Sequence, residues 1–562
     1  MDRWSATRRS FVLGVASLGA AAMAPVPSAS AAVPALSPVV TRRPVIASDR
    51  QGFNRRWFAP NLEAVYVPSR LEDVAPCVEA ALGEFGSGVK VVSGRHCYED
   101  FAYNETTRAI IDMSALNQVG YDPERSVYFV DAGADNWSAY RTLLNAYGRT
   151  LPDGSCASVG AGGHISGGGY GLMSRAHGLS IDWVTAVDVV TWDAAAGRAR
   201  LRHVSQSSAD PAERDLFWAL RGAGGGNFGV IARFCFAEPP LAPSYATLWT
   251  LGWNWADLTP RTFATLLGEY ADWVAQMPER QFSLLKLNHV AAGQVSMIVQ
   301  FASQPGESFD DHAAAAGRAI TMAQRRFGAV AALAPHVKAS LSGLRPGLVR
   351  PGNQGVQHLT FLEAVATLSG NGPNQFGKYK SAYLRRAMSG EQVEAAYAWL
   401  HTTPDGVPTA QMSQSLIQVD SYGGAINRVA SDATAVPQRS SLLKVQYQTY
   451  WNNASRVGQG DVGRYADQQA AHLSWIRGLY QDSFASSGGT PDPRRAGGDG
   501  VEGCYANYPD SDLGTHADGR ADDALWLYYL DNFRNRPRNL VAVKRRWDPT
   551  NVFRNAQSIP TS

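Results

Sequence analysis

DGSCASVGAGGHISGGGYG, residues 153–171, and SGRHCYEDF, residues 93–101, are the two stretches that decide the fold of this chain. Glycine lets backbone amides approach an anionic ligand closely, because it has no Cβ in the way and can adopt positive φ. A pyrophosphate is the ligand that such stretches favour. Each stretch also holds one reactive side chain, Cys156 in the longer and His96 in the shorter.

Either residue alone has an ordinary explanation, since a His beside glycine is commonly a turn or core residue and an isolated Cys is commonly an inert buried thiol. The combination, in this order and at this spacing, resembles the FAD-linked oxidases of the berberine-bridge-enzyme type, in the vanillyl-alcohol-oxidase/PCMH superfamily. In that family both side chains bond covalently to one flavin. The resemblance therefore implies FAD attached through His96 and Cys156. Val92 and Arg95 depart from the family's pattern, so Arg95 either crowds the loop or donates to a phosphate.

The resemblance also implies a set of residues around the flavin. They lie in the two stretches, in a second glycine cluster at residues 222–229 and in the C-terminal tail, and they are Ser93, Gly94, Arg95, Gly162, Gly163, His164, Gly167, Gly168, Gly169, Gly171, Gly226, Asn227, Val230 and Asn555. We interpret His164 as a loop residue beside the isoalloxazine. The second cluster contains a formal GxGxxG, but a Rossmann fingerprint follows a strand and precedes a helix. Here the order is reversed, because the helix-like stretch 215–221 precedes the cluster and the strand-like stretch 230–236 follows it.

Length and composition exclude several classes of protein. A chain of 562 residues is too long for one hydrophobic core, so at least two domains are expected. The 51 Lys and Arg against 49 Asp and Glu leave a formal charge of +2, which argues against a nucleic-acid partner. Five scattered cysteines do not form a disulfide framework, and whether Cys97 is in a disulfide is left open. HExxH, P-loop, zinc and GxSxG motifs are absent, so neither a metal nor a hydrolase elbow is expected.

The N-terminal residues have the pattern of an export signal. Residues 7–13, TRRSFVL, contain a twin arginine, an apolar run follows to residue 24, and small residues stand at 29–31. We expect a Tat signal peptide over residues 1–31, a transient partnership with the Tat machinery and a secreted protein. No later stretch is long enough to span a membrane, so no stable membrane anchor is expected.

Periodicity predicts an α+β fold. The first region alternates strands with helices: strands at 64–68, 89–92, 109–111, 126–132 and 183–192, and helices at 71–85 and 137–147. From about residue 239 longer alternating strands follow, at 283–288, 294–301 and 442–451. With the resemblance, this predicts a two-part FAD-binding domain of PCMH type over 57–238 and a substrate domain over 239–505, an antiparallel sheet backed by helices. A C-terminal segment over 506–562 is expected to return to the FAD domain, with a helix over 524–546 whose basic residues 544–546 face solvent.

Oxidation of an alcohol by a flavin needs a base for the hydroxyl proton and a hydride acceptor, the flavin N5. Residues 503–510, GCYANYPD, place two tyrosines three residues apart. Carbohydrate-oxidising members of the resembled family carry a similar YxxY, which assigns the base to Tyr508 and a substrate contact to Tyr505. A phenol of pKa about 10 needs help to act as a base, so we expect Asp420 to be the partner of Tyr508.

Two strand segments supply further candidates. A period of two places Gln418 with Asp420 on one strand face and Lys444 with Gln446 on another, and both pairs resemble active-site strands of the family. We predict that Gln418 and Gln446 contact substrate or flavin. Tyr450, on the same face as Gln446, is the alternative base. Each residue alone is equally compatible with an ordinary edge-strand role.

These observations predict a secreted FAD oxidase that converts a hydroxyl group of a small-molecule substrate to a carbonyl and reduces O2 to H2O2. The substrate expected is a glycosylated or polyketide natural product, because the Tat signal and composition are similar to those of family members that act late in antibiotic biosynthesis. An oligosaccharide oxidase, lactol to lactone, is the alternative. A flavoprotein that binds a drug without turnover is the hypothesis from another class.

Overall fold

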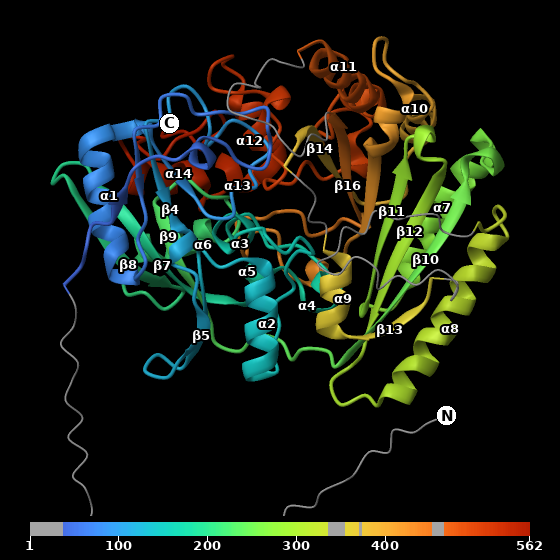
Figure 1. Ribbon diagram of the computed structural model, residues 1–562, viewed down its shortest axis with the longest axis horizontal. Helices are drawn as coiled ribbons and strands as arrows, with labels where there is room; N and C mark the ends of the chain where they lie inside the picture. Colours follow the sequence, from blue (N-terminus) through green and yellow to red (C-terminus); the bar gives the residue numbers. More distant parts are fainter. Residues whose placement is uncertain (1–36, 335–354, 370–373, 452–465) are drawn as a thin grey trace, which may run out of the picture. The chain divides into compact units, whose positions relative to one another are not determined.

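Three β-sheets organise residues 37–334, 355–369, 374–451 and 466–562, which are the residues that the computed structural model describes. Residues 39–562 form one unit. The two smaller sheets lie within residues 42–236, and the largest lies within residues 245–451. The arrangement confirms the predicted α+β class (Figure 1).

The four-stranded sheet confirms the first predicted unit. Its order is β1-β2-β4-β3, and its strands are β1 (Arg42–Arg43), β2 (Ala64–Tyr66), β3 (Val89–Val92) and β4 (Ala109–Asp112). β2, β4 and β3 run parallel, and α1 (Leu71–Phe85) connects β2 to β3. α1 buries Val74, Cys77, Val78 and Ala81, the spacing of one helical face. β3 ends directly before the His96 stretch.

The five-stranded sheet is antiparallel, in the order β5-β6-β9-β7-β8. Its strands are β5 (Val119–Asp122), β6 (Val127–Asp131), β7 (Val184–Asp193), β8 (Arg198–Ser205) and β9 (Val230–Phe236). Helices α2 (Asn136–Tyr147), α3 (Ala161–Ser166), α4 (Ser174–His177) and α5 (Ser180–Trp183) separate β6 from β7, and α6 (Pro211–Leu220) separates β8 from β9. His164 lies in α3, so its placement in a loop is wrong; its amide donates to the carbonyl of Gly160, which begins the helix.

The seven-stranded sheet has the order β13-β10-β12-β11-β15-β16-β14, with antiparallel pairing throughout. Its strands are β10 (Tyr245–Asn254), β11 (Gln281–Asn288), β12 (Gln294–Ala302), β13 (Gln357–Thr360), β14 (Phe376–Leu384), β15 (Leu416–Ser421) and β16 (Leu443–Trp451). The associated helices are α7 (Pro260–Gln276), α8 (Phe309–Gly328), α9 (Phe361–Leu368), α10 (Gly390–Leu400) and α11 (Ala466–Ser483). α8 packs on β10 and α11 on β14 and β16, which confirms a sheet backed by helices (Figure 1).

Strand alternation gives the large sheet two chemically different faces. On β16, Tyr447 stacks edge-on against Tyr480 of α11 and Thr449 hydrogen-bonds His472 of α11, so this side is called the helix face. Lys444 and Gln446 alternate with these residues and point to the opposite side, called the site face.

The C-terminal region differs from its prediction. The helix expected over 524–546 is three helices, α12 (Ala521–Tyr529), α13 (Asp531–Arg534) and α14 (Leu540–Trp547). The chain turns at Leu530, whose φ is +46°, and α14 starts anew at Asn539, whose side chain accepts from the amide of Ala542. The prediction that the basic residues 544–546 face solvent is also wrong for Lys544. Its ammonium is fully buried and donates to Asp548 and to the carbonyls of Asn227 and Phe553, whereas the next two arginines are exposed.

Two expectations stay predictions. The proposed signal peptide, residues 1–31, lies outside the described residues. The domain boundaries at 57–238, 239–505 and 506–562 are compatible with the division of strands between the sheets but are not tested by it. Within the described ranges, no helix combines the length and apolar character needed to cross a membrane.

Candidate active site

The two glycine-rich stretches meet backbone to backbone. A Cβ on Gly94 would stand 2.2 Å from the backbone nitrogen of Gly160, so the close approach requires glycine there. The imidazole Nε2 of His96 lies 2.9 Å from the Ser158 hydroxyl, two residues after Cys156. Burial lowers the pKa of His96 to about 4, which keeps the imidazole neutral near pH 7. The fold thus brings the segments of His96 and Cys156 together.

Arg95 takes a role that neither sequence alternative describes. Its backbone is left-handed, with φ +60°, a conformation that costs a non-glycine residue about 1–2 kcal/mol. Its guanidinium contacts the carboxylates of Asp112 at 2.5 Å and Asp49 at 3.2 Å, and it also donates to the carbonyl of Ser48. These ion pairs hold the strained turn that presents His96. Donation from Arg95 to a phosphate stays a prediction.

Hydrogen bonds with the side chains of Asn136 and His164 stabilise the turn that carries Cys156. The side-chain amide of Asn136 donates to the backbone carbonyls of Gly154 and Cys156, at 3.3 and 3.1 Å. His164 Nε2 accepts from the amide of Gly154 at 3.0 Å, and burial lowers the pKa of His164 to about 4, so the ring is neutral and acts as an acceptor. His164 therefore shapes the Cys156 turn. All five cysteines lie in described parts of the chain, and none is in a disulfide bond there.

The glycines divide into two groups that test whether a cofactor fits. A Cβ on Gly163 would meet nothing within 4 Å, and one on Gly226 would meet only the Asn555 amide at 4.0 Å. These glycines border open space, as a cradle for a pyrophosphate requires. Others are packed against protein: Gly162 against Ala132, Gly167 against Asn507, Gly168 against Val436, Gly169 against Ser180 and Gly171 against Asp153. The residues present therefore fit an FAD, and the backbone of Gly163 and Gly226 would hold it.

The C-terminal tail closes against the second glycine cluster. The Asn227 side chain accepts from the amide of Ile559 at 2.9 Å and donates to the carbonyl of Ala223 at 2.9 Å. Asn555 lies beside Gly226 and accepts from the amide of Gln557. Asn227 therefore fastens the tail to the cluster, and the buried Val230 begins β9 directly behind it. On the first stretch, the Ser93 hydroxyl donates to the carbonyl of Ala132.

A lysine joins the two catalytic residues predicted from the sequence. Lys444 Nζ lies 3.0 Å from the Tyr508 hydroxyl and 3.2 Å from Asp420 Oδ2, and its side chain is fully buried. Asp420 pairs with Lys444 across β15 and β16, and its other oxygen accepts from the Gln418 amide at 2.8 Å. The expected direct partnership of Asp420 with Tyr508 is therefore corrected: Lys444 stands between them, because cross-strand register places it there.

Burial and the charged groups around Tyr508 do not all shift its pKa in the same direction. Burial raises the pKa of Tyr508 well above 10, and the Asp420 carboxylate adds to the rise. The Lys444 ammonium acts in the opposite sense, since a cation in contact favours the phenolate. Burial also raises the pKa of Asp420, against the effect of Lys444. An ionised Cys156 thiol would add to the rise in the pKa of Tyr508.

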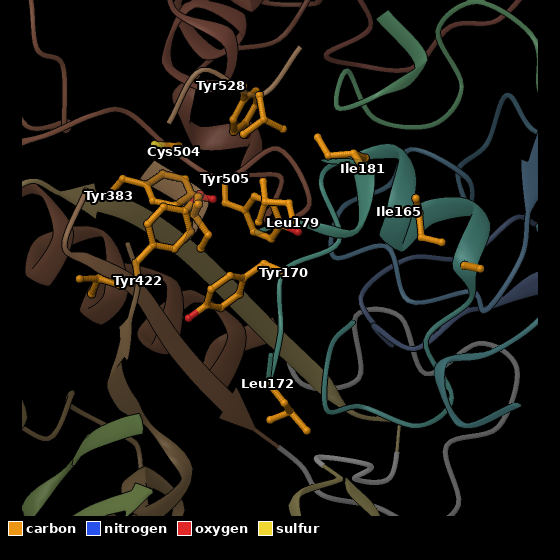
Figure 2. Packing of buried hydrophobic residues seen from close by; sticks show 14 of the residues in the cluster. Ile165, Tyr170, Leu172, Leu179, Ile181, Tyr383, Tyr422, Cys504, Tyr505 and Tyr528 are labelled. Carbon is orange, nitrogen blue, oxygen red and sulfur yellow. The ribbon is translucent and has the colours of Figure 1, made fainter. Parts of the chain in front are cut away.

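Tyr505 lies in the aromatic core beneath Tyr508. Its ring centroid is 5.0 Å from that of Tyr508 and 6.1 Å from that of Tyr383, and Figure 2 shows it among Tyr383, Tyr422 and Tyr170. The Asn507 amide donates to its hydroxyl at 3.1 Å. Tyr505 is therefore placed to support the Tyr508 turn, and its predicted contact with substrate stays a prediction.

A polar chain on the site face contains a residue that sequence reasoning missed. Tyr450 donates to Gln448, Gln448 to Gln446, and Gln446 to the hydroxyl of Tyr98, at 2.8, 2.8 and 3.3 Å. Tyr98 stacks on Tyr379 and lies 5.6 Å, ring to ring, from Tyr508. Tyr450 is thus joined to this chain, and within the described residues it makes no hydrogen bond to Lys444 or Asp420. The position of Tyr98, two residues after His96, was the signal available in the sequence.

A separate polar group lies on the five-stranded sheet. Asp188, His203 and Cys235 place potential ligand atoms within 4.8 Å of one another. Arg125 Nη1 already donates to Asp188 at 3.0 Å, and His203 Nδ1 lies 2.7 Å from the same carboxylate. Within the described residues, this carboxylate is therefore satisfied by protein groups.

Comparison with known proteins agrees with this geometry. The model described as FAD binding domain matches residues 62–198, and the model described as Berberine and berberine like matches residues 504–560. The chain is 37% identical to a hexose oxidase of Chondrus crispus, over 92% of this chain and 94% of that enzyme. It is 34% identical to an aclacinomycin-N/aclacinomycin-A oxidase of Streptomyces galilaeus, over 98% of each. The crystal structure of the glycopeptide hexose oxidase DBV29 with teicoplanin superposes with a TM-score of 0.75, at 29% identity, over 93% of this chain and 99% of that one.

Proposed function

This chain belongs to the berberine-bridge-enzyme-like family of FAD-linked oxidases, and on that premise we propose that it oxidises a hydroxyl group of a hexose unit, with O2 as the electron acceptor. The observation that carries the proposal is the contact of Lys444 with Tyr508 at 3.0 Å, beside the segments of His96 and Cys156. A phenol held against a buried ammonium ionises more easily, and its phenolate can take the proton of a sugar hydroxyl.

Each group of the site has its own role in this reaction. Bound FAD supplies the hydride acceptor and passes the electrons to O2. The Tyr508 hydroxyl oxygen, as phenolate, takes the proton of the substrate hydroxyl. Lys444 stabilises that phenolate, and Asp420 holds Lys444 in place through the contact at 3.2 Å. Gln446 and Tyr98 offer hydrogen-bonding groups beside the reacting hydroxyl.

The hexose is the part of the proposal that rests on relatives. One relative is named a hexose oxidase, and a structural neighbour is named a glycopeptide hexose oxidase. Both names place the chemistry on a hexose, and the second name adds a glycopeptide. This extends the lactol-to-lactone alternative to hexoses carried by larger natural products.

The attachment of FAD through both His96 and Cys156 is part of the same proposal. The neutral imidazole of His96 has a lone pair available, and the Cys156 segment lies against it through Ser158. Digestion of the denatured holoenzyme should yield flavin on peptides that contain both residues. His96→Ala and Cys156→Ala should each keep one attachment, and a flavin that washes free of the denatured wild-type chain would contradict this part. Export through the Tat machinery is proposed on residues 7–31 and is tested by their deletion.

Peroxide release with a panel of hexoses, oligosaccharides and glycosylated polyketides tests the function. We expect anaerobic bleaching of the flavin by at least one hexose-containing compound and H2O2 when air is admitted. Tight binding of one compound without flavin reduction by any of them would favour a drug-binding flavoprotein.

A further inference from the structure

A second lysine lies on the site face of the large sheet. Lys286 on β11 pairs with Gln418 on β15, and Gln418 pairs with Gln446 on β16. Residues that pair directly across antiparallel strands project from the same face. Lys286 therefore shares one row with the two glutamines of the site, and Ser296 on β12 continues the row.

The ammonium group of Lys286 has different surroundings from those of the other lysines on this sheet. Among the described residues it has no hydrogen-bond acceptor and no carboxylate within 4.0 Å, whereas Lys444 has Asp420 and the two lysines of β14 each contact carboxylates. Its side chain is only partly exposed. Burial lowers the pKa of Lys286, and the Asp420 carboxylate and an ionised Cys156 thiol act against that effect, so both lie near it.

The charges on the site face do not balance. While the Tyr508 hydroxyl keeps its proton, Lys286 and Lys444 carry two positive charges, and Asp420 carries one negative charge. A cation held partly out of water without an anion is unfavourable, and an incoming anion would remove that cost. One further negative charge would balance the three groups, which suits a carboxylate better than a doubly charged phosphate.

We infer that Lys286 binds a carboxylate of the substrate, which makes an acidic hexose, a hexuronic acid free or in a glycoside, the preferred substrate class. The inference rests on the proposed function, because it places the carboxylate on the molecule whose hydroxyl faces Tyr508. β11 and β16 are two strands apart, about 10 Å at ~4.8 Å per strand, and Lys444 lies two residues along β16 from the position level with Lys286, ~7 Å further in that direction. The two backbone positions are therefore about 12 Å apart, and the four-carbon stems of the lysines shorten that gap. One sugar unit can therefore contact both groups.

The test compares sugars that differ only at C6, D-galactose with D-galacturonate and D-glucose with D-glucuronate, on the holoenzyme. We expect the wild type to have at least a tenfold higher kcat/KM for the uronate than for the hexose of each pair. In Lys286→Met, which keeps most of the length and removes the charge, the ratio should fall at least tenfold, mainly through KM. Lys286→Arg should retain most of the preference.

Arg318→Met removes a positive charge from an exposed position on α8 and serves as the matched control, in which the ratio should stay at the wild-type value. Peroxide from none of the sugars tested, neutral or acidic, would contradict the proposed function. Equal kcat/KM for hexose and uronate in the wild type, or a ratio that Lys286→Met leaves unchanged, would overturn the role of Lys286 alone.

If the free sugars do not reduce the flavin, calorimetric titration of the holoenzyme with D-galacturonate decides the role of Lys286. Affinity at least tenfold weaker in Lys286→Met supports it. Absence of binding to the wild type, or equal affinity in both proteins, overturns it.

Discussion

The two faces of the large sheet hold lysine and carboxylate groups in opposite ways. On the helix face, Lys378 contacts Glu99 and Asp510 at 2.6 Å each, and Lys380 contacts Asp510 and Asp512 at 2.8 Å each. Both lysines are at most 3% exposed. On the site face, Lys444 has one carboxylate and a phenol, and Lys286 contacts neither within the described residues. Among these residues, each lysine of the helix face has carboxylate partners, whereas the site face has more lysines than carboxylates.

The two faces therefore have different roles: the helix face stabilises the structure, and the site face contacts the reacting groups. Glu99 follows His96 by three residues, and Asp510 follows Tyr508 by two, so the helix-face cluster fastens the segments that carry the attachment residue and the base. A saturated cluster has no group left for a substrate. The site face keeps its ammonium groups for a phenolate and for a ligand.

The largest effect is expected from Tyr508→Phe. Removal of the base should lower the rate of anaerobic flavin reduction by about 10²–10⁴, the range typical of general acid–base catalysis. Tyr447→Phe removes a hydroxyl from the helix face of β16 and should keep the wild-type rate. Stopped-flow absorbance of the flavin measures both. A Tyr508→Phe enzyme as fast as the wild type would assign the proton to another group.

Lys378→Met should destabilise the fold by about 3–5 kcal/mol, because it leaves the buried carboxylate of Glu99 without its cation, whereas Asp510 keeps Lys380. Arg386→Met, which breaks the exposed ion pair with Asp499, is the control and should cost about 1 kcal/mol or less. Urea unfolding followed by tryptophan fluorescence gives both values. Equal midpoints for the two variants would show that the helix-face cluster does not hold the structure.

Sequence patterns predicted what depends on neighbouring residues. Helix 71–85 follows from apolar residues at helical spacing, and strand 89–92 from an apolar run ahead of a loop. The segments of His96 and Cys156 were singled out because each motif is local. A period of two also placed Asp420 and Lys444 on site strands.

The rest depended on contacts between distant residues. Lys444 stands between Asp420 and Tyr508 because of a strand register that spans 24 positions, and Lys544 is buried because it reaches a carbonyl 317 positions away. The break at Leu530 rests on a positive φ in a residue type that seldom adopts it. No local pattern encodes these features.

The smallest effect concerns His472 on the helix face. Burial lowers its pKa to about 4, against about 6.5 in an unfolded chain. Between these values the unfolded state binds more protons, so its contribution to stability is present above pH 6.5 and is lost as the pH falls through 4. The free energy of unfolding should therefore decrease by up to ~1.4 kcal/mol per pH unit from this group. His472→Gln should show a shallower pH dependence in urea unfolding, and an identical slope would contradict the assignment.

The central claim is that the Lys444 ammonium makes Tyr508 an effective base. The most direct measurement is the pH dependence of anaerobic flavin reduction, with the best sugar of the panel, in the wild type and in Lys444→Met. The wild-type rate should rise with pH as Tyr508 loses its proton, and in the variant that rise should move upward by about one to three pH units, because the phenolate has lost its cation. Superimposable profiles for the two proteins would contradict the claim.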